Sequence, residues 1–154
     1  DEQLHLIRKL ELRIVTQPHF ISERGDQYLR DVDAVDQPWL YRAASFLNQG
    51  IPLASGSDAP FGGDSPWQSM QAAVRRKTPC GEIMCNAQAL SPEQALDLFL
   101  SPPDSPGLNH RRVTEGSPAD LCLLHESWEN VRDNLGDCKV RSTWREGKLI
   151  YGSI

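Results

Sequence analysis

The sequence predicts an α/β fold in which a parallel sheet is followed by a smaller antiparallel one. Residues 13–17 and 51–55 are short β-branched or apolar runs, and each follows a stretch with helical character. Helix and strand alternating in this way are typical of a parallel sheet. A Pro-rich break at residues 102–107 then separates this part from three short strand-like runs. The chain therefore divides into a parallel α/β part and an antiparallel β part.

The first part contains two helix-strand pairs. Leucines recur at helical spacing over residues 4–12, directly before the strand at 13–17. Residues 39–49 are good helix formers, with a proline suited to the first turn and Gly50 suited to a left-handed end. The strand at 51–55 is short and continuously apolar, which indicates burial on both faces.

A loop rich in Gly, Pro and Asp, residues 56–66, follows this strand and precedes two more predicted helices, at 67–76 and 91–100. Ser91 and Gln94 have the spacing of a capping box, which makes the second helix start the clearest in the chain. The three strands of the antiparallel part are predicted at residues 119–124, 140–145 and 149–151, with a tight hairpin between the last two.

Composition excludes several classes of protein. The chain has 154 residues, 39% of them hydrophobic, and a net charge of −5, which describes a globular domain rather than a disordered one. Its basic residues are scattered, so we expect no nucleic-acid partner. No apolar run approaches the roughly 20 residues of a membrane-spanning helix, so we expect no membrane partner. The start lacks a Met and a secretory signal, from which we expect a piece of a longer cytoplasmic protein.

The four cysteines allow two interpretations. The acidic composition and the missing signal favour free thiols in a reducing compartment, with Cys122 a small buried residue of its strand. A structural zinc site is the alternative, although Cys122 and Cys138 lack the close spacing that zinc ribbons show. The cysteines lie at positions 80, 85, 122 and 138.

Asp58 is the main candidate for chemistry. It follows a predicted parallel strand on a Gly-rich loop, where α/β folds gather ligands and catalytic groups. A carboxylate there can bind a divalent metal or take a proton from water. The alternative is an Asx turn before Pro60. Gln17 and His19 follow the other strand, so we expect His19 at the same edge of the sheet. There its imidazole could be a metal ligand, a proton carrier or a hydrogen-bond donor to substrate. The alternative is a loop histidine that is hydrogen-bonded to backbone.

Three segments in order, residues 50–60, 115–124 and 143–151, resemble the C-terminal part of the metal-dependent amidohydrolases. The most similar branch is amidohydrolase family 3, which includes N-substituted formamide deformylases. The resemblance implies the C-terminal portion of a (β/α)8 TIM-type barrel over residues 1–112, with strands seven and eight at 13–17 and 52–56. It implies that residues 113–154 form part of a small β-sandwich.

The resemblance also implies roles for single residues. Asp58 would be both a metal ligand and the catalytic general base, and Gln17 and His19 would bind substrate. The intact protein would use a divalent metal, in this family commonly zinc, to hydrolyse a non-peptide carbon-nitrogen bond in a small amide or formamide.

The rest of the family's metal ligands have no counterpart here, so we expect the isolated chain to be inactive and to hold no metal stably. The alternative is a non-catalytic domain that serves binding or assembly. Strand edges left uncovered by a partial barrel also predict self-association.

Overall fold

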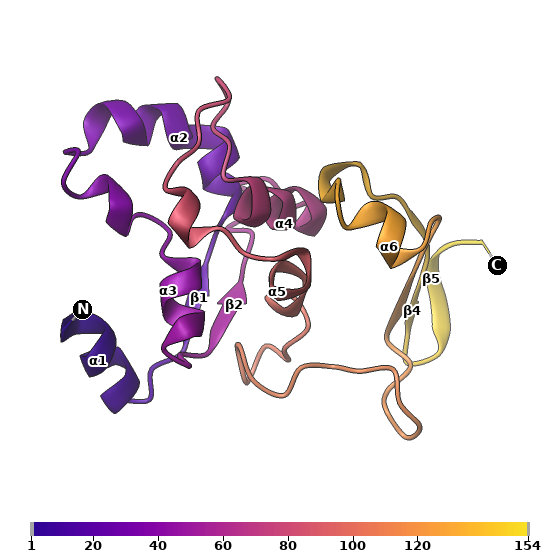
Figure 1. Ribbon diagram of the computed structural model, residues 1–154. Coiled ribbons are helices and arrows are strands. Elements are labelled where there is room, and N and C mark those ends of the chain that lie inside the picture. Colours follow the sequence, from indigo (N-terminus) through magenta and orange to yellow (C-terminus); the bar gives the residue numbers. More distant parts are fainter. Residues whose placement is uncertain (1, 154) are drawn as a thin grey trace.

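The computed structural model describes residues 2–153 and contains the predicted parallel strand pair (Figure 1). Strand β1 (Ile14–Thr16) pairs in parallel with β2 (Leu53–Ser55), with Ile14 opposite Leu53 and Thr16 opposite Ser55. Helices α1 (Glu2–Lys9) and α3 (Ala43–Asn48) precede them in the chain. The predicted helix-strand order and the parallel pairing are therefore confirmed.

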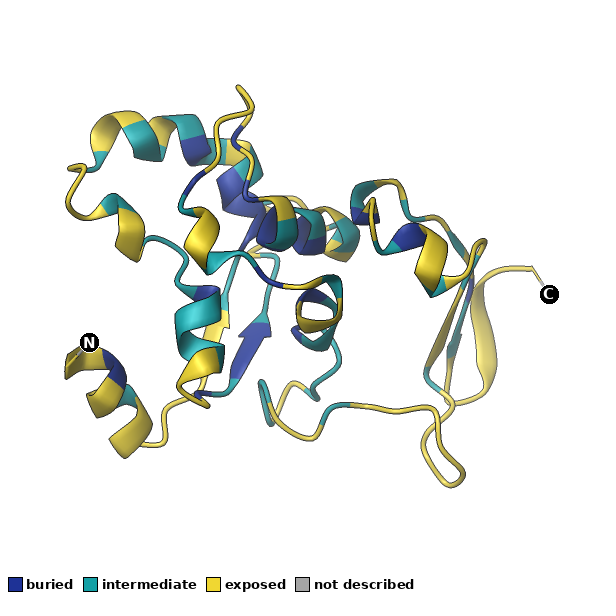
Figure 2. Cartoon of the chain, viewed as in Figure 1, coloured by how far each residue is buried: buried dark blue, intermediate teal, exposed yellow. Residues whose placement is uncertain are grey.

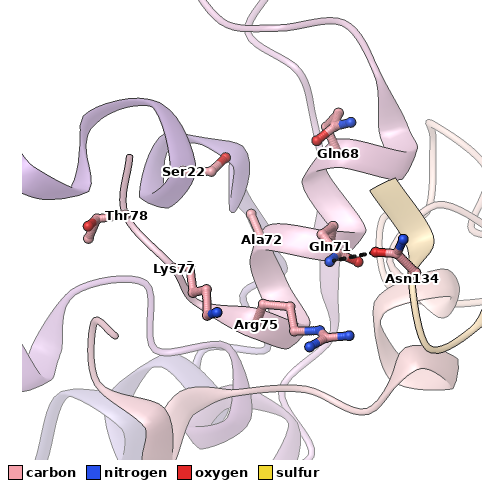
Figure 3. A pocket seen from close by; sticks show the side chains of 8 residues that line it. All are labelled: Ser22, Gln68, Gln71, Ala72, Arg75, Lys77, Thr78 and Asn134. Carbon is pink, nitrogen blue, oxygen red and sulfur yellow. Dashed lines mark hydrogen bonds between the residues drawn. The ribbon is translucent and has the colours of Figure 1, made fainter. Parts of the chain in front are cut away.

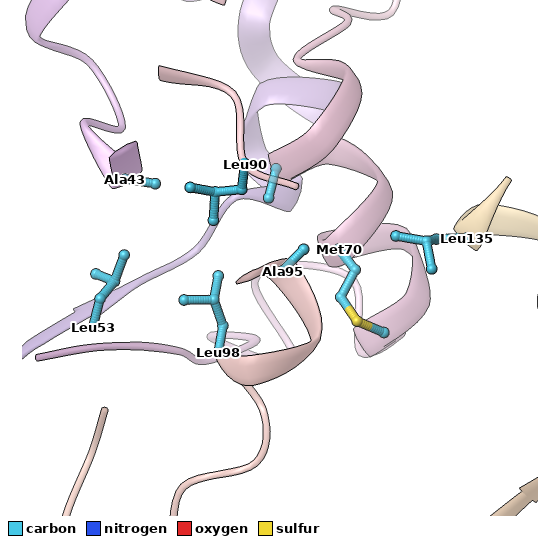
Figure 4. Packing of buried hydrophobic residues seen from close by; sticks show 8 residues of the cluster. Ala43, Leu53, Met70, Leu90, Ala95, Leu98 and Leu135 are labelled. Carbon is cyan, nitrogen blue, oxygen red and sulfur yellow. The ribbon is translucent and has the colours of Figure 1, made fainter. Parts of the chain in front are cut away.

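Helices α4 (Pro66–Arg75) and α5 (Pro92–Asp97) pack near β2 and enclose the main core (Figure 4). In Figure 2, β2 is dark blue while β1 is mostly exposed or half-buried. A serine caps the N-terminus of each helix. The Ser65 side chain accepts a hydrogen bond from the Gln68 amide, and Ser91 forms the predicted capping box with Gln94. The core cluster consists of Ala43, Leu53, Met70, Ala73, Leu90, Ala95, Leu98 and Leu135.

The C-terminal part is a three-stranded antiparallel sheet in the order β3-β4-β5. Its strands are β3 (Leu121–Leu124), β4 (Val140–Arg145) and β5 (Lys148–Gly152), as predicted to within two residues at each end. Glu146 and Gly147 both have positive φ, which a two-residue hairpin turn requires. Residues 111–119, which connect this sheet to the first part, are exposed at every position.

Two short helices between β3 and β4 attach the sheet to the core, and the sequence patterns did not predict them. They are α6 (Trp128–Val131) and η3 (Leu135–Asp137). Leu135 is fully buried in the core cluster, and the Gln68 side-chain amide donates to the Gly136 carbonyl at 2.9 Å. The antiparallel part is thus packed against α4 rather than joined to it by the connector alone.

The predicted helix at 39–49 is interrupted, which corrects the prediction. A 3-10 turn, η1 (Gln37–Trp39), comes first, and α3 begins only at Ala43. Between them the Leu40 and Tyr41 carbonyls turn away from helical geometry and accept hydrogen bonds from the Arg76 guanidinium, both at 3.1 Å. A distant side chain therefore breaks a segment that has good helix propensity. A further 3-10 turn, η2 (Asn86–Gln88), precedes α5.

Helix α2 (His19–Asp31) is the longest in the structure and was missed by the sequence patterns. Gly25 stands in its middle, where glycine usually lowers helix stability. A Cβ at Gly25 would lie 2.5 Å from the Thr78 methyl carbon, so the glycine allows the segment after α4 to pack directly on α2.

The prediction that Cys122 is buried is wrong. It lies on β3, an edge strand whose residues are exposed or half-buried. Its strand is apolar, yet the sheet has little packed against that face.

Candidate functional site

The C-terminal ends of β1 and β2 are tied together by polar groups. The Ser55 hydroxyl donates to the Thr16 carbonyl at 3.3 Å and lies 3.4 Å from the hydroxyl of Ser69 on α4. The Gly56 amide also donates to the Thr16 carbonyl, at 3.0 Å. The segment carrying Gln17 and His19 and the loop carrying Asp58 therefore leave the sheet at one edge, as predicted.

Asp58 presents an exposed carboxylate on a constrained backbone. Its φ is +53°, and its carbonyl accepts from the amides of Phe61 at 2.9 Å and Gly62 at 3.2 Å. Its carboxylate forms no hydrogen bond or ion pair with the residues from 2 to 153. The Asx-turn alternative is therefore wrong: the main chain of Asp58 closes the turn, and its side chain stays available.

His19 begins α2 and lies beneath the Asp58 loop. It is 1% exposed, and neither ring nitrogen has a hydrogen-bond partner among the described residues. Its ring packs against Phe20, with the centroids 4.4 Å apart. A Cβ at Gly62 would lie 2.3 Å from His19 Nε2, so the loop backbone covers the imidazole. His19 and Asp58 thus share one edge of the sheet without a hydrogen bond between them.

Two side chains at this edge of the sheet have groups that can bind a metal. Asp58 offers one free carboxylate, and His19 offers an imidazole without a partner. Over residues 2–153 no group of three or more His, Cys, Asp or Glu is placed to hold a metal ion. A catalytic zinc takes about three protein ligands, a number that Asp58 and His19 do not reach by themselves. The four cysteines are free thiols.

A separate polar depression of about 310 Å³ lies between α2, α4 and η3 (Figure 3). Gln71 and Asn134 approach each other across it at 3.5 Å. None of the three predicted site residues lines it, and the sequence patterns had not indicated it. Its lining is Ser22, Gln68, Gln71, Ala72, Arg75, Lys77, Thr78 and Asn134.

Comparison with known proteins assigns the family. The sequence profile of the amidohydrolase family matches residues 1–151. The chain belongs to the amidohydrolase family. This confirms the relationship that the three sequence motifs had indicated.

Individual amidohydrolase relatives are much longer than this chain. An N-substituted formamide deformylase from Arthrobacter pascens is 27% identical over 116 residues, which cover 73% of this chain and 21% of that protein. Crystal structures of uncharacterized metal-dependent hydrolases from Pyrococcus furiosus and Pyrococcus horikoshii OT3 are 32% and 28% identical, with TM-scores of 0.53 and 0.55. Each match covers 64% of this chain and 20% of the solved one. The chain therefore spans about one fifth of the length of these relatives.

No helix within residues 2–153 has both the length and the apolar character needed to cross a bilayer.

Proposed function

We propose that this chain is the C-terminal part of a metal-dependent amidohydrolase that hydrolyses a non-peptide carbon-nitrogen bond in a small amide or formamide. The observation that carries the proposal is the Asp58 carboxylate, which is exposed on a constrained loop directly after β2 and has no hydrogen-bond or ion-pair partner in the part of the chain that the structure describes. Similarity to an N-substituted formamide deformylase supports the class of substrate. The acidic composition and the free thiols support a cytoplasmic location.

Asp58 would act as a metal ligand and as general base in the intact protein. A bound divalent metal, with zinc as our proposal, would lower the pKa of a coordinated water toward neutrality. An unpartnered carboxylate can take the proton from that water and deliver it to the leaving nitrogen. Because the turn fixes the Asp58 backbone, it restricts the positions that the carboxylate can occupy during this proton transfer.

Gln17 and His19 would contact the substrate. Gln17 follows β1 at the same edge as Asp58, and its side-chain amide can both donate and accept a hydrogen bond. Neither ring nitrogen of His19 has a hydrogen-bond partner among residues 2–153, so the imidazole retains its hydrogen-bonding capacity toward a substrate. Access to it requires the loop around Gly62 to move.

Alone, the chain would be inactive because its donor set is incomplete. The alternative function, a non-catalytic domain that serves binding or assembly, is favoured by the same incomplete set. The remaining metal ligands would have to come from chain that lies outside these 154 residues, and the relatives are long enough to carry them.

The decisive experiment uses the complete gene product, with Asp58→Asn as the test variant and Asp64→Asn as the control. Asp64 is an exposed carboxylate of the same loop. Activity toward N-substituted formamides and zinc content are measured for each protein. We expect Asp58→Asn to lower kcat about 100- to 10,000-fold and Asp64→Asn to leave it unchanged.

Full activity in Asp58→Asn would refute the role of Asp58. A complete gene product with neither zinc nor hydrolase activity would favour the binding or assembly function.

A further inference from the structure

Arg24 of α2 holds Phe61, which lies three residues after Asp58. The guanidinium carbon is 3.9 Å from the centroid of the Phe61 ring and 5.0 Å from that of Phe20. Arg24 Nη2 also donates to the Phe61 carbonyl at 3.5 Å. The two rings themselves meet edge to face at 5.8 Å. The Arg24 guanidinium thus lies within cation–π distance of both rings and stacks most closely on Phe61.

The next two loop residues are also held by α2. The Gly63 amide donates to Glu23 Oε1 at 3.0 Å. Gly62 packs on the imidazole of His19 so closely that a Cβ could not be accommodated without movement of the loop. Three consecutive residues, Phe61, Gly62 and Gly63, are therefore each fixed by a different side chain from the first two turns of α2.

These contacts reach Asp58 through the backbone. The amides of Phe61 and Gly62 are the donors to the Asp58 carbonyl. Displacing either residue therefore removes a bond that holds Asp58 at its positive φ. The Asp58 carboxylate forms no hydrogen bond or ion pair of its own with any residue from 2 to 153, so its position depends on these two amides.

We infer that Glu23 and Arg24 are positioning residues, which clamp the loop through Phe61 and Gly63 and so set the direction of the Asp58 carboxylate. The inference rests on the proposed function for its catalytic meaning, although the clamp itself is a property of this chain. Glu23 is exposed and Arg24 is half-buried, and neither belongs to the core cluster. Their loss should loosen the loop without unfolding the protein.

The test measures amide hydrogen exchange and the ¹³Cγ shift of Asp58 by NMR in the 154-residue chain without metal or substrate. Variants are Glu23→Ala, Glu23→Gln and Arg24→Ala. Arg30→Ala is the matched control, since Arg30 lies on the same helix and pairs only with the exposed Asp31 among the described residues.

We expect Glu23→Ala and Arg24→Ala to speed exchange at the Phe61 and Gly62 amides about three- to tenfold and to shift the Asp58 ¹³Cγ signal, with Tm unchanged. Glu23→Gln keeps an acceptor for the Gly63 amide and should restore the wild-type values, and Arg30→Ala should have no effect.

Faster exchange confined to Gly63 in Glu23→Ala, with Phe61, Gly62 and the Asp58 signal unchanged, would overturn the inference. Because no catalysis is involved, that failure would leave the proposed role of Asp58 standing. Conversely, an active Asp58→Asn protein would refute the catalytic role and leave the clamp in place.

Discussion

Replacing Arg76 with methionine should cause a large loss of stability. Arg76 is 1% exposed and follows α4 in a left-handed conformation that turns its side chain inward. Its Nε donates to the Met84 carbonyl at 2.6 Å, and its two terminal nitrogens donate to the Tyr41 and Leu40 carbonyls at 3.1 Å. Burial lowers the pKa of the guanidinium, but arginine remains protonated in proteins.

The size of the effect follows from these three bonds. Hydrogen bonds to a charged group contribute about 1.5–3 kcal/mol each. Arg76→Met removes the guanidinium donor from the Met84 and Leu40 carbonyls and leaves the Tyr41 carbonyl with the Ala43 amide as its donor. The avoided cost of burying the guanidinium offsets part of that loss, so we expect a net destabilisation of about 3–5 kcal/mol. Domains of this kind have about 5–15 kcal/mol in total. The segment between η1 and α3 should lose its order first.

Urea unfolding followed by tryptophan fluorescence measures this loss. Arg75→Met is the matched control, because Arg75 is the exposed neighbour and donates to one backbone carbonyl, that of Asp133. We expect the control to change the free energy of unfolding by less than about 1 kcal/mol. A free energy of unfolding for Arg76→Met within 1 kcal/mol of wild type would refute the reasoning.

Two further predictions concern pH and association. Hydrogen bonds from Thr78 and then Cys80 lower the pKa of Asp26 in the folded protein. The stability that these bonds contribute is therefore present above the ordinary carboxyl pKa and is lost as the pH falls through the lowered pKa of the folded protein. The protection factor of the Cys80 amide, the exchange rate of the unfolded chain divided by the observed rate at the same pH, should therefore decrease below about pH 4, and Asp26→Asn should abolish that dependence on pH. The chain should also self-associate, because Val15 is 49% exposed on β1, a strand paired on one side by β2 and otherwise open among residues 2–153. Sedimentation velocity should show a mass that rises with concentration and falls in Val15→Lys, and a monomer at high micromolar concentration would contradict this prediction.

The elements that local sequence determines were predicted well. The strands at β1 and β2 follow from short β-branched or apolar runs, and α5 follows from the Ser91 and Gln94 capping box. The place of Asp58 at a strand end also follows from chain order, since a loop after a parallel strand must emerge at that edge. Each of these features is indicated by residues that lie next to one another in the sequence.

The features that were missed depend on distant contacts. Gly25 lowers the helix propensity of its segment, yet it lies inside α2, where the Thr78 side chain from a distant part of the sequence packs on it. Residues 39–49 suggest one helix, yet Arg76 draws two of its carbonyls out of the helix. Likewise, the burial of His19 beneath Gly62 could not be predicted from either residue alone, because it depends on where the loop folds back onto α2.

The exposed connector at residues 111–119 can accept inserted residues. Its residues are all exposed and none belongs to the core cluster, and Val113 is 87% exposed. Doubling the length of a flexible loop costs only about 0.6 kcal/mol, so extra residues here would change the free energy of folding very little. Helices α6 and η3 would keep the sheet in place through their packing on α4 and α5. This connector is therefore where inserted sequence could accumulate without disturbing the strand ends that carry Asp58.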